Sequence, residues 1–370
     1  MGAVISSLNN NIQLNVAITF NVKPEEESLT EPPSSEEELS FEQSASPQIS
    51  QAYNDLYAEW DSFETIDAVR RALALYHNVT LVEANDLAFE KLRSLRPEIV
   101  FNIAEGINGI SREAQVPAML DMLNIPYTGS DPLTLATCLD KARTKEILTY
   151  YNIKNPRFIT ASSLSDLENF SLRFPVMIKP VGEGSSKGIF NSSFVTSLES
   201  LKEAVVSNFV KYRQPSLIEE FLPGREFTVA IIGNGTDAVA LPIVEINFSE
   251  LPDGMVPIYS YEAKWIVDRP ENPLEIFSCP ASVDPILEKK IKNAALRTYE
   301  ILRCRDWSRI DVRLDEDGEP NIIEVNPLPG ILPDPKDNSC FPKAARAAGL
   351  DYQQMLNRVL YVSAKRHNLI

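Results

Sequence analysis

Residues 309–326 read RIDVRLDEDGEPNIIEVN, two strand-like runs joined by a turn that contains an Asp-Gly pair. Such an arrangement predicts an antiparallel β-hairpin. Because alternate side chains share one face of a strand, Asp311 in the first run and Glu324 and Asn326 in the second are expected to converge. Oxygen ligands of this kind hold Mg²⁺ and leave positions free for water and phosphate. The hairpin therefore predicts a magnesium site, with a solvated polar sheet face as the alternative.

A Gly- and Ser-rich loop follows another expected strand. Residues 179–188 read KPVGEGSSKG. Glycines let backbone amides approach phosphate oxygens, and serine hydroxyls add further donors. The spacing matches neither the P-loop pattern nor the Rossmann glycine pattern, so both of those nucleotide sites are excluded. Taken alone, the loop fits either a phosphate-binding loop or an ordinary turn.

The order of strand-like and helix-like runs predicts an α/β unit followed by two strand-rich α+β units. In the first unit, strands are expected at 14–20, 79–83 and 98–103, with helices at 61–76 (Asp61 and Glu64 as its capping box), at 86–95 and after Ser111. Strands that alternate with helices form a parallel sheet covered on both faces. Farther on, strands are expected at 176–179, 216–220, 227–232, 238–246, 310–314 and 322–325, and helices at 139–151, after 197, at 286–302 and at 352–364. The predicted domains are 1–136, 137–222 and 223–370.

The first unit contains an acidic insertion at residues 24–50, which is rich in Glu, Ser and Pro. Such a composition cannot bury enough apolar surface to order itself. We therefore expect a disordered, solvated segment there.

Composition narrows the classes of function. The chain has 370 residues, of which 44% are hydrophobic, enough for the cores of two or three domains. A formal charge of −17 argues against a nucleic-acid partner, and no apolar stretch approaches the length of a membrane span. The four cysteines form no C-x-x-C motif, which predicts reduced thiols in a cytoplasmic protein. With two histidines, the chemistry is expected to use carboxylates, lysines, arginines and backbone amides.

Five stretches carry a resemblance to a known family. They are IPYTGS at 125–130, LDK at 139–141 with Lys145, IKPVGEGSSKG at 178–188, IEEFLPGREFTV at 218–229, and the hairpin continued to Gly330. Together they resemble the D-alanine–D-alanine ligase family of the ATP-grasp superfamily over roughly residues 98–362. The resemblance implies an ATP-grasp fold behind an N-terminal parallel-sheet domain. It also implies an ADP-forming carboxylate–amine ligase that works through an acyl-phosphate.

The same resemblance assigns roles to individual residues. Those placed at the nucleotide are Lys141, Lys179, Glu183, Ser186, Glu219, Phe221, Leu222 and Glu226. Those implied to be catalytic are Ser185 in a lid loop, Lys264 at the γ-phosphate and Arg309 at the oxyanion. Two Mg²⁺ ions, with Mn²⁺ as a substitute, would be held by Asp311, Glu324 and Asn326. Small amino-acid-like substrates and a homodimer are implied as well.

The residues for the first substrate depart from the family's pattern. Glu59 is the nearest candidate for the glutamate that holds the first amine, and Glu105 stands where a histidine is expected. Trp265 replaces a tyrosine that closes the lid, and an indole cannot accept a hydrogen bond. Gly330 and Ser339 complete the candidate substrate residues. The substrates are therefore expected to differ from D-alanine. An L-amino acid or peptide partner, and a nucleotide-binding regulatory pseudoenzyme, remain the alternatives.

Overall fold

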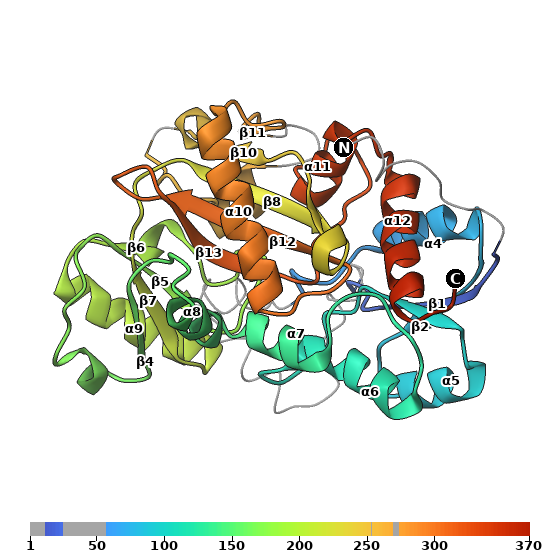
Figure 1. Cartoon of the computed structure of the whole chain (residues 1–370). Coiled ribbons are helices and arrows are strands. Elements are labelled where there is room, and N and C mark those ends of the chain that lie inside the picture. Colours follow the sequence, from blue (N-terminus) through green and yellow to red (C-terminus); the bar gives the residue numbers. More distant parts are fainter. Residues whose placement is uncertain (1–11, 25–56, 253, 269–273) are drawn as a thin grey trace, which may run out of the picture.

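The described part of the chain comprises residues 12–24, 57–252, 254–268 and 274–370 of a computed structural model, and its strands form three sheets (Figure 1). The first sheet is parallel, with the order β2-β1-β3. Its elements are β1 (Asn15–Phe20), α4 (Phe63–Ala74), β2 (Asn78–Glu83), α5 (Ala88–Leu95), β3 (Ile99–Asn102) and α6 (Gln115–Leu123). Val16 and Ile18 pack in one core with α4, whereas Ala17 and Val100 pack in another with α5 and α6. Helices therefore cover both faces, which confirms the predicted α/β unit.

The second sheet is antiparallel, with the order β4-β7-β5-β6. Its strands are β4 (Phe158–Ala161), β5 (Val176–Pro180), β6 (Phe194–Val195) and β7 (Ser216–Glu220), and α9 (Leu198–Tyr212) covers it. Leu201 and Val205 of α9 are buried against Val176 and Ile178 of β5, one of the two inner strands. The Gly/Ser-rich loop begins where β5 ends.

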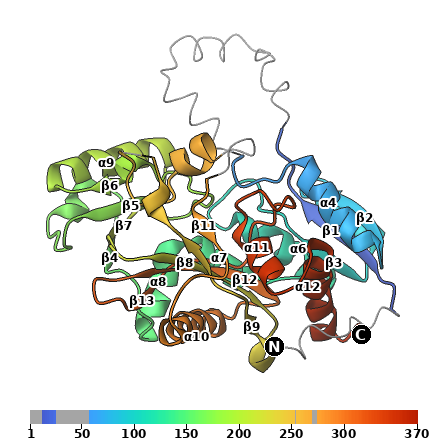
Figure 2. The same ribbon diagram turned by 90° about the horizontal axis from the view of Figure 1, so that it is seen from above.

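The third sheet is also antiparallel and follows the order β11-β10-β8-β12-β13, with β9 paired to β8. Its elements are β8 (Glu226–Ile232), β9 (Val239–Ala240), β10 (Val244–Ile246), β11 (Phe277–Ser278), α10 (Pro285–Ile301), β12 (Trp307–Leu314) and β13 (Pro320–Asn326). Strands β12 and β13 form the predicted hairpin, with Asp311 opposite Glu324 and Arg309 opposite Asn326. Seen from above, this sheet lies between the other two (Figure 2).

The first and third sheets share one core. Trp307 at the start of β12 is fully buried, and its ring meets Phe101 of β3 edge-on at 5.6 Å between centroids. On its other side it meets Phe341 of α11 (Cys340–Ala347) at 5.5 Å. The last helix, α12 (Tyr352–Arg366), packs against α4 in the same core. The C-terminal part of the chain is thus packed against the N-terminal sheet.

Two predicted helix starts were wrong. Ser62, not Asp61, caps α4, because its extended backbone lets the hydroxyl accept from the Thr65 amide. Asp61 instead pairs with Val22 across a β-bridge, and partial burial raises the pKa of its carboxyl to about 7. Ser111 makes no side-chain cap, because its backbone is not extended, and a short 3₁₀ turn (Arg112–Ala114) precedes α6.

Two other predicted elements are each interrupted. The helix expected at 139–151 begins instead at Lys141, since Asp140 is extended and separates α7 (Pro132–Leu139) from α8 (Lys141–Tyr150). The Asp140 carboxylate caps α8 through the amides of Ala142 and Arg143. The strand expected at 238–246 is split into β9 and β10, with Pro242 between them, which has no amide to donate to a ladder.

Apart from residue 24, the predicted acidic insertion lies outside the described residues. No helix in the described ranges has the length and apolar character that a membrane crossing needs. The predicted division into three domains remains a prediction.

Candidate active site

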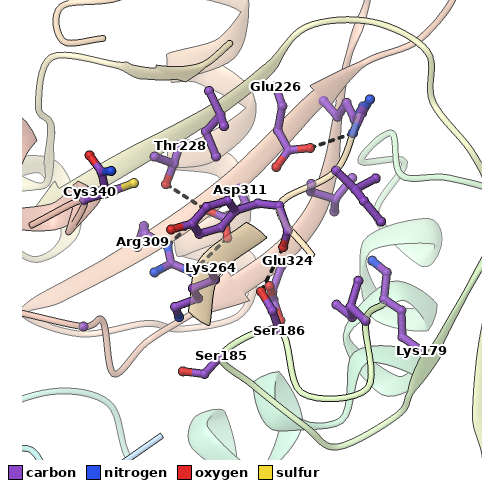
Figure 3. A pocket seen from close by; sticks show the side chains of 18 of the residues that line it. Lys179, Ser185, Ser186, Glu226, Thr228, Lys264, Arg309, Asp311, Glu324 and Cys340 are labelled. Atoms are coloured by element: carbon purple, nitrogen blue, oxygen red, sulfur yellow. Dashed lines mark hydrogen bonds and ion pairs between the residues drawn. The ribbon is translucent and has the colours of Figure 1, made fainter. Parts of the chain in front are cut away.

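A cavity of about 250 Å³ lies between the second and third sheets, and residues that precede α4 contribute to its lining. The predicted site residues that line it are Glu59, Lys179, Ser185, Ser186, Glu219, Phe221, Leu222, Glu226, Lys264, Arg309, Asp311, Glu324, Gly330 and Ser339. Figure 3 shows Arg309, Asp311 and Glu324 on the strands of the third sheet, with Ser185 and Ser186 on the loop below them. Lys141, Glu183, Glu105 and Asn326 are not among the lining residues.

The predicted metal ligands are brought together by the β12–β13 hairpin. The Asp311 carboxylate accepts hydrogen bonds from Thr228 Oγ1 at 2.6 Å, from Arg309 at 3.0 and 3.1 Å, and from Asn326 Nδ2 at 3.2 Å. Glu324 lies opposite Asp311 and pairs with Lys141 at 2.9 Å. No cluster of three or more His, Cys, Asp or Glu side chains suited to a metal occurs in the described ranges. The set here is two carboxylates and one amide, whose oxygens are hard donors that fit Mg²⁺.

A buried carboxylate holds two lysines, of which Lys179 lines the cavity. Glu219 of β7 pairs with Lys145 of α8 at 2.8 Å and with Lys179 of β5. Burial acts to raise the pKa of Glu219, but the two ammonium groups outweigh it and lower the pKa to about 2. The family resemblance places Glu219 at the nucleotide, whereas both of its oxygens face lysines. Its role in the structure is to fix the Lys179 ammonium at the cavity.

The Gly/Ser-rich loop has an unusual backbone and is held at several points. Ser185 and Ser186 both have left-handed φ angles, of 50° and 62°, which non-glycine residues adopt at an energetic cost. The hydroxyl of Ser186 donates to Tyr259 O at 2.9 Å. The Glu183 carboxylate pairs with Lys187 at 2.7 Å and accepts from Gln214 Nε2 at 2.7 Å, while its carbonyl accepts from Lys141 Nζ. These contacts fix the loop over the cavity.

Glu59 and Arg112 connect the N-terminal unit to this loop. Arg112 NH2 donates to both Glu59 oxygens at 2.8 Å, and its NH1 donates to Gly182 O at 2.9 Å. The Gly184 amide also donates to Glu59. Burial acts to raise the pKa of Glu59, but Arg112 and Lys187 outweigh it and lower the pKa. The sequence proposed Glu59 as the group that holds a substrate amine, but its carboxylate is occupied by protein donors. The importance of Arg112 was missed, since nothing local distinguishes it.

The other candidate substrate residues lie in different surroundings. Glu105 follows β3, and its pKa is raised well above its usual range by burial and by the nearby carboxylates of Glu113, Glu59 and Asp61. Ser339 donates to Gly330 O and accepts from the Leu332 amide, both at 3.2 Å, so it fixes the turn of backbone that lines the cavity. The side chain of Trp265 lies outside the described part of the structure.

Arg309 and Lys264 place two cationic groups beside Asp311 (Figure 3). Burial acts to lower the pKa of Arg309, but Asp311 outweighs it, so the guanidinium stays charged. Burial, together with Arg309 and Lys23, lowers the pKa of Lys264 to about 8. Cys340, which the sequence analysis did not single out, faces the same end of the cavity, and burial raises the pKa of its thiol to about 12. The site thus combines fixed positive charge with two carboxylates.

The far end of the cavity is lined by apolar side chains and one ion pair. Phe221 and Leu222 follow β7 there. Glu226 of β8 pairs with Arg313 of β12 at 2.9 Å. Arg313 was also missed as a site residue, although the strand alternation that places Arg309 and Asp311 on one face extends to it.

The chain is similar to known proteins over most of its length. Residues 146–361 match the family model described as the D-ala D-ala ligase C-terminus. The chain is 35% identical over 271 residues to the uncharacterized protein y4sG of Sinorhizobium fredii, covering 73% of this chain and 75% of that one. It is 33% identical over 302 residues to a D-alanine–D-alanine ligase of Actinobacillus pleuropneumoniae, covering 80% and 91%.

A solved structure supports the fold. The D-alanine–D-alanine ligase of Bacillus anthracis complexed with ATP superposes with a TM-score of 0.64 at 22% identity, covering 97% of this chain and 99% of that one. At 22% identity, this match shows that the two proteins share a fold.

Proposed function

Because the chain belongs to the D-alanine–D-alanine ligase family of ATP-grasp proteins, we propose that it joins the carboxylate of one small amino-acid-like substrate to the amine of another, with ATP converted to ADP. The observation that carries this proposal is the convergence of Asp311, Glu324 and Arg309 on one face of the hairpin, opposite Lys179 and the Gly/Ser-rich loop. Phosphoryl transfer needs positioning and charge neutralisation more than covalent assistance, and this set of residues supplies both.

ATP would lie along the cavity between the second and third sheets. Phe221 and Leu222 would contact the adenine, Glu226 the ribose, and Lys179 the phosphates. A relative of the same fold is complexed with ATP, which supports this assignment. Asp311, Glu324 and Asn326 would hold Mg²⁺, which when bound would neutralise phosphate charge.

The chain's own residues would perform the remaining work. Arg309 remains charged at any physiological pH and would stabilise the oxyanion as the amine attacks the activated carboxylate. Lys264 would approach the γ-phosphate from the same side. The loop at 181–188 would exclude water, which would otherwise hydrolyse the acyl-phosphate.

We propose that D-alanine is a poor donor of the carboxylate. The Glu59 carboxylate already accepts hydrogen bonds from Arg112 and the Gly184 amide. It would therefore bind the ammonium group of a substrate less strongly than a free carboxylate would. Glu105 stands nearby, where the family's pattern has a histidine. Since Glu59 is already paired and Glu105 does not line the cavity, we expect the donor to be a different amino acid.

The proposal is tested by measuring ADP release with Mg²⁺, ATP and pairs drawn from a panel of D- and L-amino acids, followed by mass spectrometry of the product. We expect ADP and amide in equal amounts for one or a few pairs. Rapid formation of D-alanyl-D-alanine from D-alanine alone would refute the substrate proposal and leave the ligase proposal standing. ADP release that no amino acid stimulates would refute the ligase proposal.

A further inference from the structure

Arg313 has no role in the chemistry described so far, yet it is buried in the wall of the cavity. It lies on β12 two residues beyond Asp311, with 5% of its surface exposed. Its NH1 donates to Glu226 Oε2 at 2.9 Å, and its NH2 donates to Pro257 O at 2.9 Å. Burying an arginine costs free energy unless its charge is paired and its donors are hydrogen-bonded, and these two contacts supply both.

Two aromatic rings fix the orientation of the guanidinium. Its central carbon is 4.6 Å from the ring centroid of Phe221 and 5.2 Å from that of Phe248. Contact with two rings leaves a planar guanidinium little freedom. Since the same group holds the Glu226 carboxylate, the orientation of Glu226 is fixed with it.

One donor of Arg313 is still unused. Its Nε is buried and has no hydrogen-bond partner among the described residues. A buried donor without an acceptor is costly, and the cost is removed when a ligand provides an acceptor. The side chain lines the end of the cavity that also contains Phe221 and Leu222. This observation points to a ligand there independently of the ion pair.

We propose that Arg313 determines specificity for the nucleoside through two contacts. It holds the Glu226 carboxylate where that group accepts hydrogen bonds from the ribose hydroxyls. It also donates its free Nε–H to the bound nucleoside. The inference rests on the proposed function, because it assumes that ATP occupies this cavity. The ion pair of 2.9 Å between Arg313 and Glu226 is the contact that fixes the carboxylate in this position.

The test is direct binding of nucleotides to the full-length protein, without amino acids, by calorimetry. ATP is compared with 2′,3′-dideoxy-ATP, which lacks both ribose hydroxyls. The variants are R313M, which keeps the length of the side chain, R313K, which keeps its charge, and E226Q. The matched control is R225M: Arg225 pairs with Glu245 at 2.7 Å and lies 5.2 Å from the Phe227 ring, but it does not line the cavity.

We expect the native protein and R225M to prefer ATP over the dideoxy nucleotide. R313M and E226Q should bind ATP about tenfold more weakly, with a smaller loss for the dideoxy nucleotide, so that the preference largely disappears. R313K should retain part of the preference. A preference unchanged in both R313M and R313K, or equal losses for the two nucleotides, would overturn the proposal. Native protein that binds neither nucleotide would refute the proposed function itself.

Discussion

The backbone amide of Gly184 donates to Glu59 Oε1 at 2.6 Å, which joins the loop after β5 to the segment that precedes α4. A Cβ added at Gly184 would also lie 2.6 Å from that oxygen, closer than real Cβ atoms approach. A side chain at this position would therefore push the Glu59 carboxylate away from its present place. The hydrogen bond makes the position of the loop depend on the N-terminal unit as well as on the second sheet.

Gly184→Ala should displace the loop and lower turnover several-fold, because the new methyl group and Glu59 cannot occupy the same space. The matched control is Gly182→Ala in the same loop, where the added Cβ would meet only the end of the Gln214 side chain, at 3.3 Å. Steady-state ADP release measures both. Equal activity of the two variants would show that the contact between Gly184 and Glu59 does not matter for turnover.

Arg112→Met should destabilise the fold by about 3–5 kcal/mol, because it leaves the buried Glu59 carboxylate without its closest cation. Urea unfolding measures the change. Arg143→Met is the control, since Arg143 pairs with Glu146 on an exposed helix face and should give no measurable change. If Arg112→Met lowers the free energy of unfolding no more than the control does, the pair of Arg112 and Glu59 does not stabilise the fold.

The pairing of Glu219 with two lysines predicts a dependence of stability on pH. The folded pKa of about 2 lies below the ordinary 4.5, so the stabilisation is fully present above pH 4.5 and is lost as the pH falls towards 2. At about 1.4 kcal/mol per pKa unit, Glu219→Gln should cost about 3 kcal/mol at neutral pH. The difference from the native protein should shrink below pH 4.5. A difference that stays constant from pH 7 to pH 3 would disprove the assignment.

The sequence predicted the hairpin and the shared position of its polar side chains because strand alternation is local information. Asp311, Glu324 and Asn326 meet as expected. Arg112 could not be identified in the same way, since its partners lie 53 and 70 residues away along the chain. The pairing of Glu219 with Lys145 likewise depends on how α8 packs beside β7. Patterns within one element were therefore predictable, whereas ion pairs between elements were not.

Asp311→Asn and Glu324→Gln should each abolish turnover and leave the fold intact, because each removes a charged oxygen from the proposed Mg²⁺ site. Asp317→Asn, at the exposed turn of the same hairpin, is the matched control and should keep full activity. ADP release at saturating Mg²⁺ measures turnover, and circular dichroism checks the fold. Near-native turnover by either cavity variant would remove these residues from the metal site.

Isotope transfer tests the central claim most directly. The carboxylate of the amino-acid donor is labelled with ¹⁸O, the reaction is run with ATP, Mg²⁺ and the accepting amine, and the inorganic phosphate is examined by mass spectrometry. If the carboxylate is activated as an acyl-phosphate, the amine displaces phosphate together with the bridging oxygen. The account predicts one ¹⁸O in the phosphate for each amide formed. Amide formed alongside phosphate that carries no ¹⁸O would contradict it.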